Sequence, residues 1–369
     1  MNSYRFIISG GGTGGHIFPA IAIANALKAT CPDAQILFVG AKGKMEMQKV
    51  PAAGYAIEGL WISGLQRHEW QKNLLFPFKI LSSVVQSFRI LNRFKPHAVI
   101  GVGGYASGAI LYAAQMAGIS TFIQEQNSFP GLTNKLLAKK IRAAFVAYEG
   151  LEKYFGKEKT FLYGNPIREQ LFAHNASKKG EALAFFNFQD HKKTLFVFGG
   201  SLGAKAINEA ILANLEVFIA NDVQVIWQTG EIFFDTARAK IEALGSKNIR
   251  AMPFLERMDL AYCLAQVVVS RAGAGTISEL ATVCKPAIFV PLPTAAEDHQ
   301  TKNAMALVSK NAALMIENRE ASTKLLPLAM SLLQNVELQM TLKANIAHFD
   351  RHHAASQMAQ HITQILENK

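Results

Sequence analysis

The same local pattern occurs in each half of this chain: a short apolar run, a glycine-rich turn and a helical stretch. Residues 5–27 have the sequence RFIISGGGTGGHIFPAIAIANAL, and residues 193–211 have the sequence KTLFVFGGSLGAKAINEAI. More apolar runs alternate with helical segments after each copy. Short strands separated by helices are typical of parallel sheets with crossover helices. The repeat therefore predicts an α/β protein with two Rossmann-like, doubly wound domains that face each other across a cleft.

The chain length supports this division, because 369 residues correspond to two domains of ordinary size. We expect the boundary after the Asn165-Pro166 turn. The N-terminal domain would then cover 1–166, and the C-terminal domain 167–349. A last helix, about 350–369, is expected to pack back onto the N-terminal domain.

The apolar runs also predict where the strands lie. In the first half of the chain we expect strands at 5–9, 35–40, 98–104, 120–127, 143–148 and 160–166. In the second half, the apolar run that begins at Lys193 is expected to be a strand, and further strands are expected at 224–230, 249–254, 267–273 and 287–293. The first helix is expected from Pro19 to Ala29. The polar stretch 174–193 is expected to be a surface connection.

The net charge of +11 indicates a nucleic acid, an anionic membrane or an anionic substrate as partner. Only 18% of the residues are charged, which argues against nucleic acid, because such binders concentrate Lys and Arg in stripes. The aromatic residues fall in strand-like runs and in one apolar helix. We therefore expect no nucleic acid partner.

The three cysteines, Cys31, Cys263 and Cys284, are far apart and form no CxxC pair. They are expected to be small apolar fillers in a reducing compartment. No secretory signal precedes the first strand, which favours a cytoplasmic location. The chain contains no Asp-x-Asp sequence, so we expect neither a protein-bound metal nor a cofactor.

Three glycine-rich turns, 10–15, 101–108 and 199–204, each follow an apolar strand. Glycine lets backbone N–H groups approach phosphate or sugar oxygens, and a helix N-terminus adds partial positive charge. The first turn also fits the dinucleotide pattern G-x-G-x-x-G. That pattern needs an acid after the second strand, but here Lys42 follows Gly40 and Ala41, which disfavours a nicotinamide or flavin oxidoreductase. Tight strand–helix packing explains one such turn, but three favour a ligand cleft.

A fourth group of residues, 270–279, again places a strand, a turn of small residues and a helix in succession. Glu279 would lie near the start of that helix. Its carboxylate could accept two hydrogen bonds from a ribose diol. Alternatively, it could simply complement the helix dipole, which contributes about 0.3–1 kcal/mol.

Between residue 5 and about residue 305, the chain carries seven motifs: GGGTGGHIFPA, GVGGYASG, EQNSFPGLTNK, GNPIR, FGGSLGA, SRAGAGTISEL and DHQTKNA. In this order and spacing they resemble the MurG family. These membrane-associated N-acetylglucosaminyltransferases convert lipid I to lipid II in peptidoglycan synthesis. The resemblance implies a GT-B fold, UDP-N-acetylglucosamine as donor and inversion at the anomeric carbon. It also implies a peripheral location on the cytoplasmic face of the bacterial inner membrane.

The resemblance further implies a set of binding residues for the donor. The diphosphate, sugar and nucleoside would be held by Thr13, Gly14, Gly15, Asn127, Arg168, Ser201, Leu255, Ala274, Gly275, Thr276, Ile277, Ser278, Glu279 and Gln300. Among these, Leu255 would present its backbone to the uracil. The second glycine turn, with Gly103, Gly104 and Tyr105, would hold the acceptor diphosphate. The role of His299 stays open.

Transfer needs a base that removes the proton from the 4-hydroxyl of the muramoyl sugar. His16, at the mouth of the first glycine turn, is our candidate base, and Glu125 is the alternative. His16 could instead cap the following helix or bind the acceptor diphosphate. The leaving diphosphate would be stabilised by Arg168, Ser201 and helix N-termini.

Residues 67–95 combine bulky apolar side chains with six basic residues and a single acid. Lys79, Gln86 and Arg89 argue against a spanning helix. An apolar helix with basic flanks fits docking on an anionic lipid surface. Packing on the sheet, with the basic side chains in solvent, is the simpler alternative.

Two further alternatives share the expected donor-binding half. One is another GT-B enzyme that transfers N-acetylglucosamine to a different acceptor. The other is a UDP-N-acetylglucosamine 2-epimerase, which would not need an apolar helix facing lipid.

Overall fold

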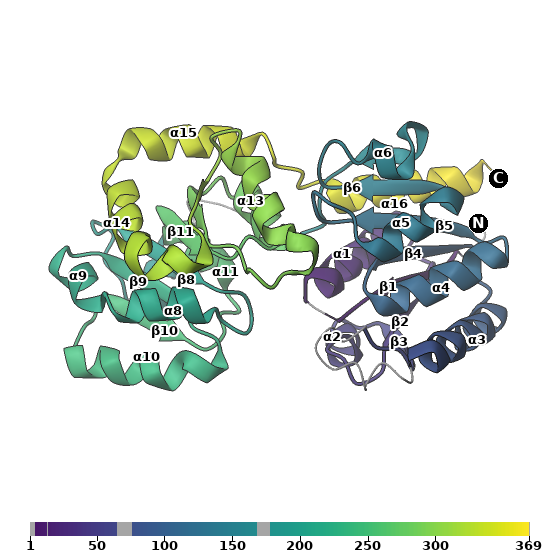
Figure 1. Ribbon diagram of the computed structural model, residues 1–369, viewed down its shortest axis with the longest axis horizontal. Coiled ribbons are helices and arrows are strands. Elements are labelled where there is room, and N and C mark those ends of the chain that lie inside the picture. Colours follow the sequence, from purple (N-terminus) through teal and green to yellow (C-terminus); the bar gives the residue numbers. More distant parts are fainter. Residues whose placement is uncertain (1–3, 13, 65–75, 168–177, 369) are drawn as a thin grey trace. The chain divides into compact units, whose positions relative to one another are not determined.

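The computed structural model describes residues 4–12, 14–64, 76–167 and 178–368. It consists of two compact units (Figure 1). One is coloured mostly purple to blue with a yellow last helix, and the other runs from teal through green to yellow-green. Unit 1 comprises Met1–Arg168 together with Arg351–Lys369, and unit 2 comprises Glu169–Asp350. Unit 1 is therefore built from two separate segments of the chain.

The sheet of unit 1 has seven strands in the order β3-β2-β1-β4-β5-β6-β7, and each neighbouring pair is parallel. The strands are β1 (Arg5–Gly10), β2 (Gln35–Ala41), β3 (Ala56–Leu60), β4 (Ala98–Gly103), β5 (Ser120–Glu125), β6 (Ala143–Val146) and β7 (Thr160–Leu162). Their sequences are nearly continuous apolar runs, as expected for strands covered on both faces.

Helices cover both faces of this sheet. Phe6 and Ile8 of β1 point into a core with α1 (Gly14–Thr30), α2 (Glu46–Ala52) and α16 (Ala354–Glu367), and Ile7 points into a second core on the other face. That second core contains α3 (Phe76–Phe94), α4 (Tyr105–Met116) and α5 (Leu132–Leu137). The short helix α6 (Glu152–Phe155) adds Phe155 to it.

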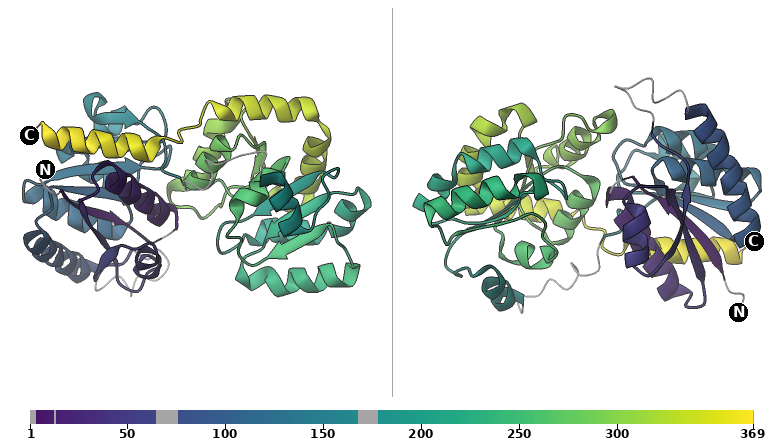
Figure 2. Two further views of the ribbon diagram at one scale, coloured as in Figure 1. Left: turned by 180° about the vertical axis from the view of Figure 1, so that it is seen from behind. Right: turned by 90° about the horizontal axis from the view of Figure 1, so that it is seen from below.

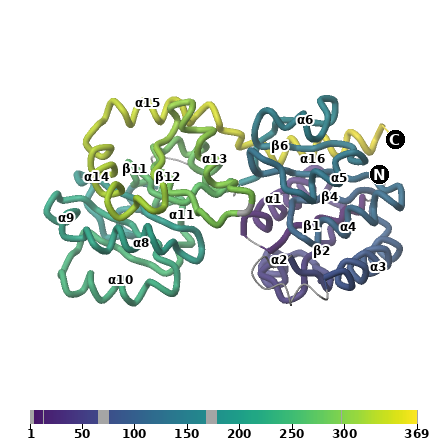
Figure 3. Tube along the Cα trace, in the orientation of Figure 1, coloured from purple at the N-terminus to yellow at the C-terminus, as the bar shows by residue number. Residues whose placement is uncertain are grey.

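The last helix of the chain, α16, completes the first of these cores. The yellow helix lies beside the purple helix α1 in both views of Figure 2, and the tube in Figure 3 places it within unit 1. Met358 and Ile362 on α16 are fully buried. The C-terminal segment is thus an integral part of unit 1.

The sheet of unit 2 has six parallel strands in the order β10-β9-β8-β11-β12-β13. They are β8 (Thr194–Phe198), β9 (Gln224–Gln228), β10 (Ile249–Met252), β11 (Val267–Ser270), β12 (Ala287–Phe289) and β13 (Leu314–Met315). The order of the first five strands is the same as in unit 1. The doubly wound repeat predicted from the glycine turns is therefore confirmed.

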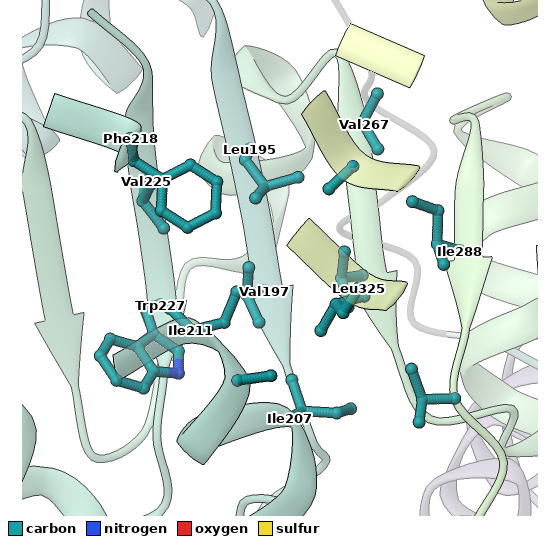
Figure 4. Close-up of a cluster of buried hydrophobic side chains, with 14 of the residues drawn as sticks. Leu195, Val197, Ile207, Ile211, Phe218, Val225, Trp227, Val267, Ile288 and Leu325 are labelled. Carbon is teal, nitrogen blue, oxygen red and sulfur yellow. The ribbon is translucent and has the colours of Figure 1, made fainter. Parts of the chain in front are cut away.

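One core of unit 2, drawn in Figure 4, packs strand residues such as Val197 and Trp227 against α8 (Lys205–Leu212) and α14 (Ala321–Gln334). On the opposite face, Tyr262 of α11 contacts Phe196 edge-on. The helices of this unit are α7 (Lys179–Phe186), α8 (Lys205–Leu212), α9 (Leu215–Ala220), α10 (Glu231–Leu244), α11 (Met258–Leu264), α12 (Ala274–Thr282), α13 (His299–Val308), α14 (Ala321–Gln334) and α15 (Val336–Ala347).

Some elements differ from the sequence predictions. Helix α1 begins at Gly14, before Pro19, so His16 lies in its first turn rather than in the glycine turn. The edge strands β3 and β13 were not predicted, because one contains a glycine and a glutamate and the other has two residues. Helix α7 replaces part of the expected surface connection, and its Ala182 and Phe186 are buried.

Candidate functional site

The first two glycine turns lie side by side in unit 1, because β1 and β4 are neighbours at the point where the strand order reverses. Ligands of open α/β sheets bind at this kind of switch point. The N–H of Gly11 donates to the carbonyl of Gly103 at 3.3 Å. Gly104 has φ of +92°, and a Cβ there would lie 2.5 Å from the Gly11 carbonyl. Only glycine therefore allows the two turns to approach so closely.

His16 lies at this contact. Its Nδ1 is 3.0 Å from the carbonyl oxygen of Gly11. Since a carbonyl can only accept, Nδ1 carries the proton, and in the neutral ring Nε2 carries the lone pair. The Nε2 edge faces Gly103, where a Cβ would lie 2.8 Å from it. The ring is therefore held in the tautomer that a general base at Nε2 requires.

Glu46 of α2, which the sequence analysis missed, holds the first glycine turn through hydrogen bonds. Its side chain is fully buried, and its two carboxylate oxygens accept from Gly12 N–H and Ala41 N–H, both at 2.9 Å. A Cβ on Gly11 would lie 2.2 Å from Oε1 of Glu46. Glu46 thus binds the turn after β1 to the end of β2.

Glu125, the alternative base, holds a loop in place. Its Oε1 accepts from the N–H and the Nδ2 of Asn127, and its Oε2 accepts from Gly131 N–H and from Asn134 Nδ2 at 2.7 Å. Burial raises the pKa of the Glu125 carboxyl, although these donors act in the opposite direction. Four donors on one buried carboxylate favour a positioning role for Glu125, and His16 remains our candidate base.

The other predicted residues of unit 1 lie at the same edge of the sheet. Gly14 and Gly15 open α1, and the exposed Tyr105 opens α4 directly after Gly104. The N-termini of two long helices therefore face this edge, which suits an anionic group. Thr13 and Arg168 lie outside the described residues.

In unit 2, the third glycine turn follows β8. Gly203 N–H donates to Gly200 O at 3.0 Å, which presents Ser201 on the exposed side of the turn. Gln228, at the end of β9, donates from Nε2 to Gly200 O and accepts from Leu255 N–H, both at 2.9 Å. One buried amide that the sequence analysis missed therefore joins Leu255, a predicted donor-binding residue, to the glycine turn that carries Ser201. With its N–H occupied, Leu255 could contact a base only through its carbonyl.

The segment Ala274–Glu279 forms most of α12, which begins beside the switch point between β8 and β11. Glu279 accepts from the Tyr262 hydroxyl at 3.1 Å, which orients the carboxylate. Ser278 donates back to the carbonyl of Ala274, and the Ile277 side chain is buried. Gly275 and Thr276, between them, are half-buried in the first turn of the helix.

Two side chains fix the neighbouring loops. Nη1 of Arg271 lies within 3.0 Å of Val290 O, Pro291 O and Asn318 Oδ1, which joins the loops after β11 and β12. Oε1 of Gln300 accepts from Leu292 N–H at 2.9 Å, so its Nε2 is the group that could donate to a sugar hydroxyl.

The predicted site residues within the described ranges fall into two groups, which follow the carboxyl ends of the strands in unit 1 and in unit 2. Within the described ranges, no three His, Cys, Asp or Glu side chains come together in a way that could hold a metal ion. Two doubly wound parallel sheets, with a glycine turn at the switch point of each, have the architecture of the GT-B class.

The chain belongs to glycosyltransferase family 28. Residues 6–146 match the N-terminal domain of that family, and residues 194–363 match its C-terminal domain. The resemblance found in the sequence motifs is thereby confirmed.

Curated relatives match the whole chain. The UDP-N-acetylglucosamine--N-acetylmuramyl-(pentapeptide) pyrophosphoryl-undecaprenol N-acetylglucosamine transferase of Flavobacterium psychrophilum is 48% identical over 369 residues, which is 100% of both chains. The enzyme of the same name from Parabacteroides distasonis is 49% identical over 100% of both chains.

Among solved structures, MurG of Acinetobacter baumannii is 27% identical, with a TM-score of 0.77 over 98% of this chain and 100% of that one. A UDP-N-acetylglucosamine 2-epimerase is 13% identical, with a TM-score of 0.66 over 100% of this chain and 98% of the other. The epimerase likeness reflects the fold alone.

Proposed function

We infer that this protein transfers N-acetylglucosamine from UDP-N-acetylglucosamine to undecaprenyl-diphospho-muramoylpentapeptide, which converts lipid I to lipid II in peptidoglycan synthesis. The observation that carries this inference is the 48% identity to a transferase of that name across all 369 residues. By contrast, the epimerase, which shares only the fold, has 13% sequence identity with this chain.

In the mechanism we propose, unit 2 binds the donor. The carboxylate of Glu279, oriented by Tyr262, accepts from the ribose hydroxyls, and the Leu255 carbonyl accepts from the uracil N–H. Ser201 and the N-terminus of α12 lie at the same switch point, where they suit the diphosphate. Arg168, outside the described residues, is proposed to add a positive charge.

The acceptor is proposed to bind unit 1, with its diphosphate at Gly103, Gly104 and Tyr105. Nε2 of His16 removes the proton from the 4-hydroxyl of the muramoyl sugar. That oxygen attacks the anomeric carbon from the face opposite UDP, so the configuration inverts. The bond to the UDP oxygen breaks, and the leaving diphosphate is stabilised by N–H donors and positive charge rather than by a protein-bound metal.

The function is tested by incubating the full chain with radiolabelled UDP-N-acetylglucosamine and a short-chain lipid I analogue. We expect a labelled lipid-linked disaccharide. A parallel reaction without the acceptor separates the alternatives: epimerised donor in that tube, and no disaccharide in the first, would identify an epimerase. Replacing lipid I by an unrelated acceptor should abolish transfer.

We also propose that α3 docks on an anionic membrane surface at the cytoplasmic face. The solvent-facing side of α3 carries large apolar side chains, since Phe78 and Leu81 are each 65% exposed, while Ser83 and Ser87 are buried together with Ile90 and Leu91. Basic side chains, Lys79, Arg89, Arg93 and Lys95, accompany the exposed apolar ones; Arg67 and Lys72 lie outside the described residues. Such a helix suits an interface of anionic lipid.

In the ranges that the structure covers, no helix has both the length and the hydrophobicity to cross a bilayer. Docking is tested by sedimentation with vesicles of phosphatidylglycerol and phosphatidylcholine at low salt. The double variant Phe78→Ser, Leu81→Ser should lose most of the bound fraction. The control Ile232→Ser removes a 93% exposed apolar side chain from unit 2 and should bind like the parent. Equal binding of all three proteins would contradict the proposal.

A further inference from the structure

A cavity of about 580 Å³ lies in unit 2 at the end of the sheet opposite the glycine turn. Its lining includes Thr194, Gln266 and Pro286. Thr194 is the first residue of β8, and the other two directly precede β11 and β12. The third glycine turn follows the other end of β8, roughly 13 Å away at the rise of a strand. The cavity is therefore separate from the proposed donor site, and its size suits a small molecule.

Positive charge dominates the cavity. Four lysines line it, against a single acid, Asp190. Two of them are neutralised locally: Lys179 pairs with Asp190, and Lys192 pairs with Asp222 at 2.6 Å. The other two are Lys285 and Lys343.

Lys285 and Lys343 form no ion pair with any carboxylate in the described part of the chain. The Lys285 ammonium donates to the Ala265 carbonyl at 2.7 Å. Burial lowers the pKa of Lys285 to about 8, and the positive charge of Lys343 acts in the same direction. Two ammonium groups thus repel each other across a partly buried space, and a bound anion would relieve that repulsion.

The cavity also has an apolar wall. Val336 and Met340 lie one turn apart on α15, and they are 61% and 66% exposed. Leu264 of α11 and Leu183 of α7 line the same space. Apolar side chains beside unpaired ammonium groups are the surroundings that an anion with an apolar body requires.

We propose that this cavity binds a small organic anion, whose acidic group lies between Lys285 and Lys343 and whose apolar part contacts Val336 and Met340. Lys285 also follows the C-terminus of α12, where a cation complements the helix dipole. That role accounts for Lys285 alone. It does not account for Lys343 or for the exposed apolar wall facing it.

Pyridoxal 5′-phosphate is a suitable probe, because it carries a phosphate, an apolar ring and an aldehyde. The Lys285 amine attacks the aldehyde carbon, water leaves, and an imine forms. Borohydride then delivers hydride to the imine carbon and fixes the label as a secondary amine, which peptide mass spectrometry locates. At pH 7.5 roughly a quarter of an amine with a pKa of about 8 is unprotonated, against about one part in a thousand for an ordinary lysine.

Reactivity and anion recognition are separated by a second probe, pyridoxal, which lacks the phosphate. In the parent protein we expect pyridoxal 5′-phosphate to label Lys285 at least about tenfold more than the exposed Lys240. This ratio is smaller than the ratio of the unprotonated fractions of the two amines. Pyridoxal should label it several-fold less. Excess inorganic pyrophosphate should protect Lys285.

Variants complete the test. In Lys343→Met, pyridoxal 5′-phosphate and pyridoxal should label Lys285 to nearly the same extent. The control Lys240→Met replaces a lysine that pairs with Glu216, and in this variant Lys285 should still be labelled more by pyridoxal 5′-phosphate than by pyridoxal. Equal labelling by both probes in the parent protein, or no protection by pyrophosphate, would overturn the proposal. Because transferase activity is not a readout, the result is independent of the proposed function.

Discussion

The carboxylate of Glu46 accepts a hydrogen bond from the backbone N–H of Gly12 at 2.9 Å. The first glycine turn therefore already holds an anion, supplied by the protein from 34 residues further along the chain. The backbone N–H of Gly12, which the glycine-rich motif would assign to a ligand phosphate, is thus already hydrogen-bonded to Glu46. Since Gly11 belongs to the same turn and its carbonyl accepts from His16, Glu46 acts on the candidate base through the backbone.

Glu46→Gln should weaken unit 1 and slow the reaction. A glutamine keeps one acceptor oxygen but turns its amide NH2 group, a donor, toward the other backbone N–H, so one buried hydrogen bond is lost, at about 1–3 kcal/mol. We expect a lower midpoint in urea and a lower kcat, with little change in the KM for the donor. Glu58→Gln is the control, because it removes a half-buried carboxylate that pairs with Arg93 away from the glycine turn, and it should affect neither quantity. An unchanged kcat would show that the turn does not depend on Glu46.

His16→Ala should lower turnover at least about 100-fold, because the base is lost, while donor affinity changes little. Both quantities are measured with the lipid I analogue and by titration with UDP-N-acetylglucosamine. His191→Ala, at an exposed position in unit 2, is the matched control. A near-normal rate in His16→Ala would remove this residue from the role of base.

Gln228→Leu should raise the KM for the donor about tenfold or more, because Gly200 O and Leu255 N–H both lose their partner. Gln224→Leu is a strict control. Gln224 lies on the same strand and is equally buried, but it bonds Gln189 and Thr194 at the other end. Both variants should lose stability, and only Gln228→Leu should lose donor affinity. If the KM for the donor rose equally in Gln228→Leu and Gln224→Leu, the rise would be due to the loss of stability alone.

His361 should make unit 1 less stable in acid. Its ring packs against Phe161, with centroids 4.1 Å apart, and its Nδ1 is 2.8 Å from the Tyr163 hydroxyl. Burial lowers the pKa of His361 in the folded state, so the unfolded chain binds a proton more readily. The stabilisation is complete above the unfolded pKa of about 6.5 and declines as the pH falls through that value. We expect the urea midpoint of the parent protein to fall more between pH 7.5 and pH 5.5 than the urea midpoint of His361→Phe.

The glycine turns and apolar runs were sufficient to predict the two parallel sheets and to place the candidate site residues at the carboxyl ends of their strands. They could not reveal Glu46 or Gln228, because each acts through a contact between segments far apart in sequence, and a buried acid or amide has no local pattern. The start of α1 was misplaced because Pro19 resembles a first helical residue, whereas the chain is already helical at Gly14. The side of α3 that faces solvent also depends on tertiary packing, since both of its faces carry apolar side chains.

The position of α16 sets an order for folding during synthesis. Unit 2 is one continuous segment that ends at Asp350, and α16 follows it in the chain. Unit 1 begins first but lacks Met358 and Ile362, which fill the core beside α1, until the segment that follows unit 2 has been made. Domains generally fold as units once their chain is complete. The N-terminal segment of unit 1 must therefore wait, with one face of its sheet incompletely covered, until the whole of unit 2 has been synthesised.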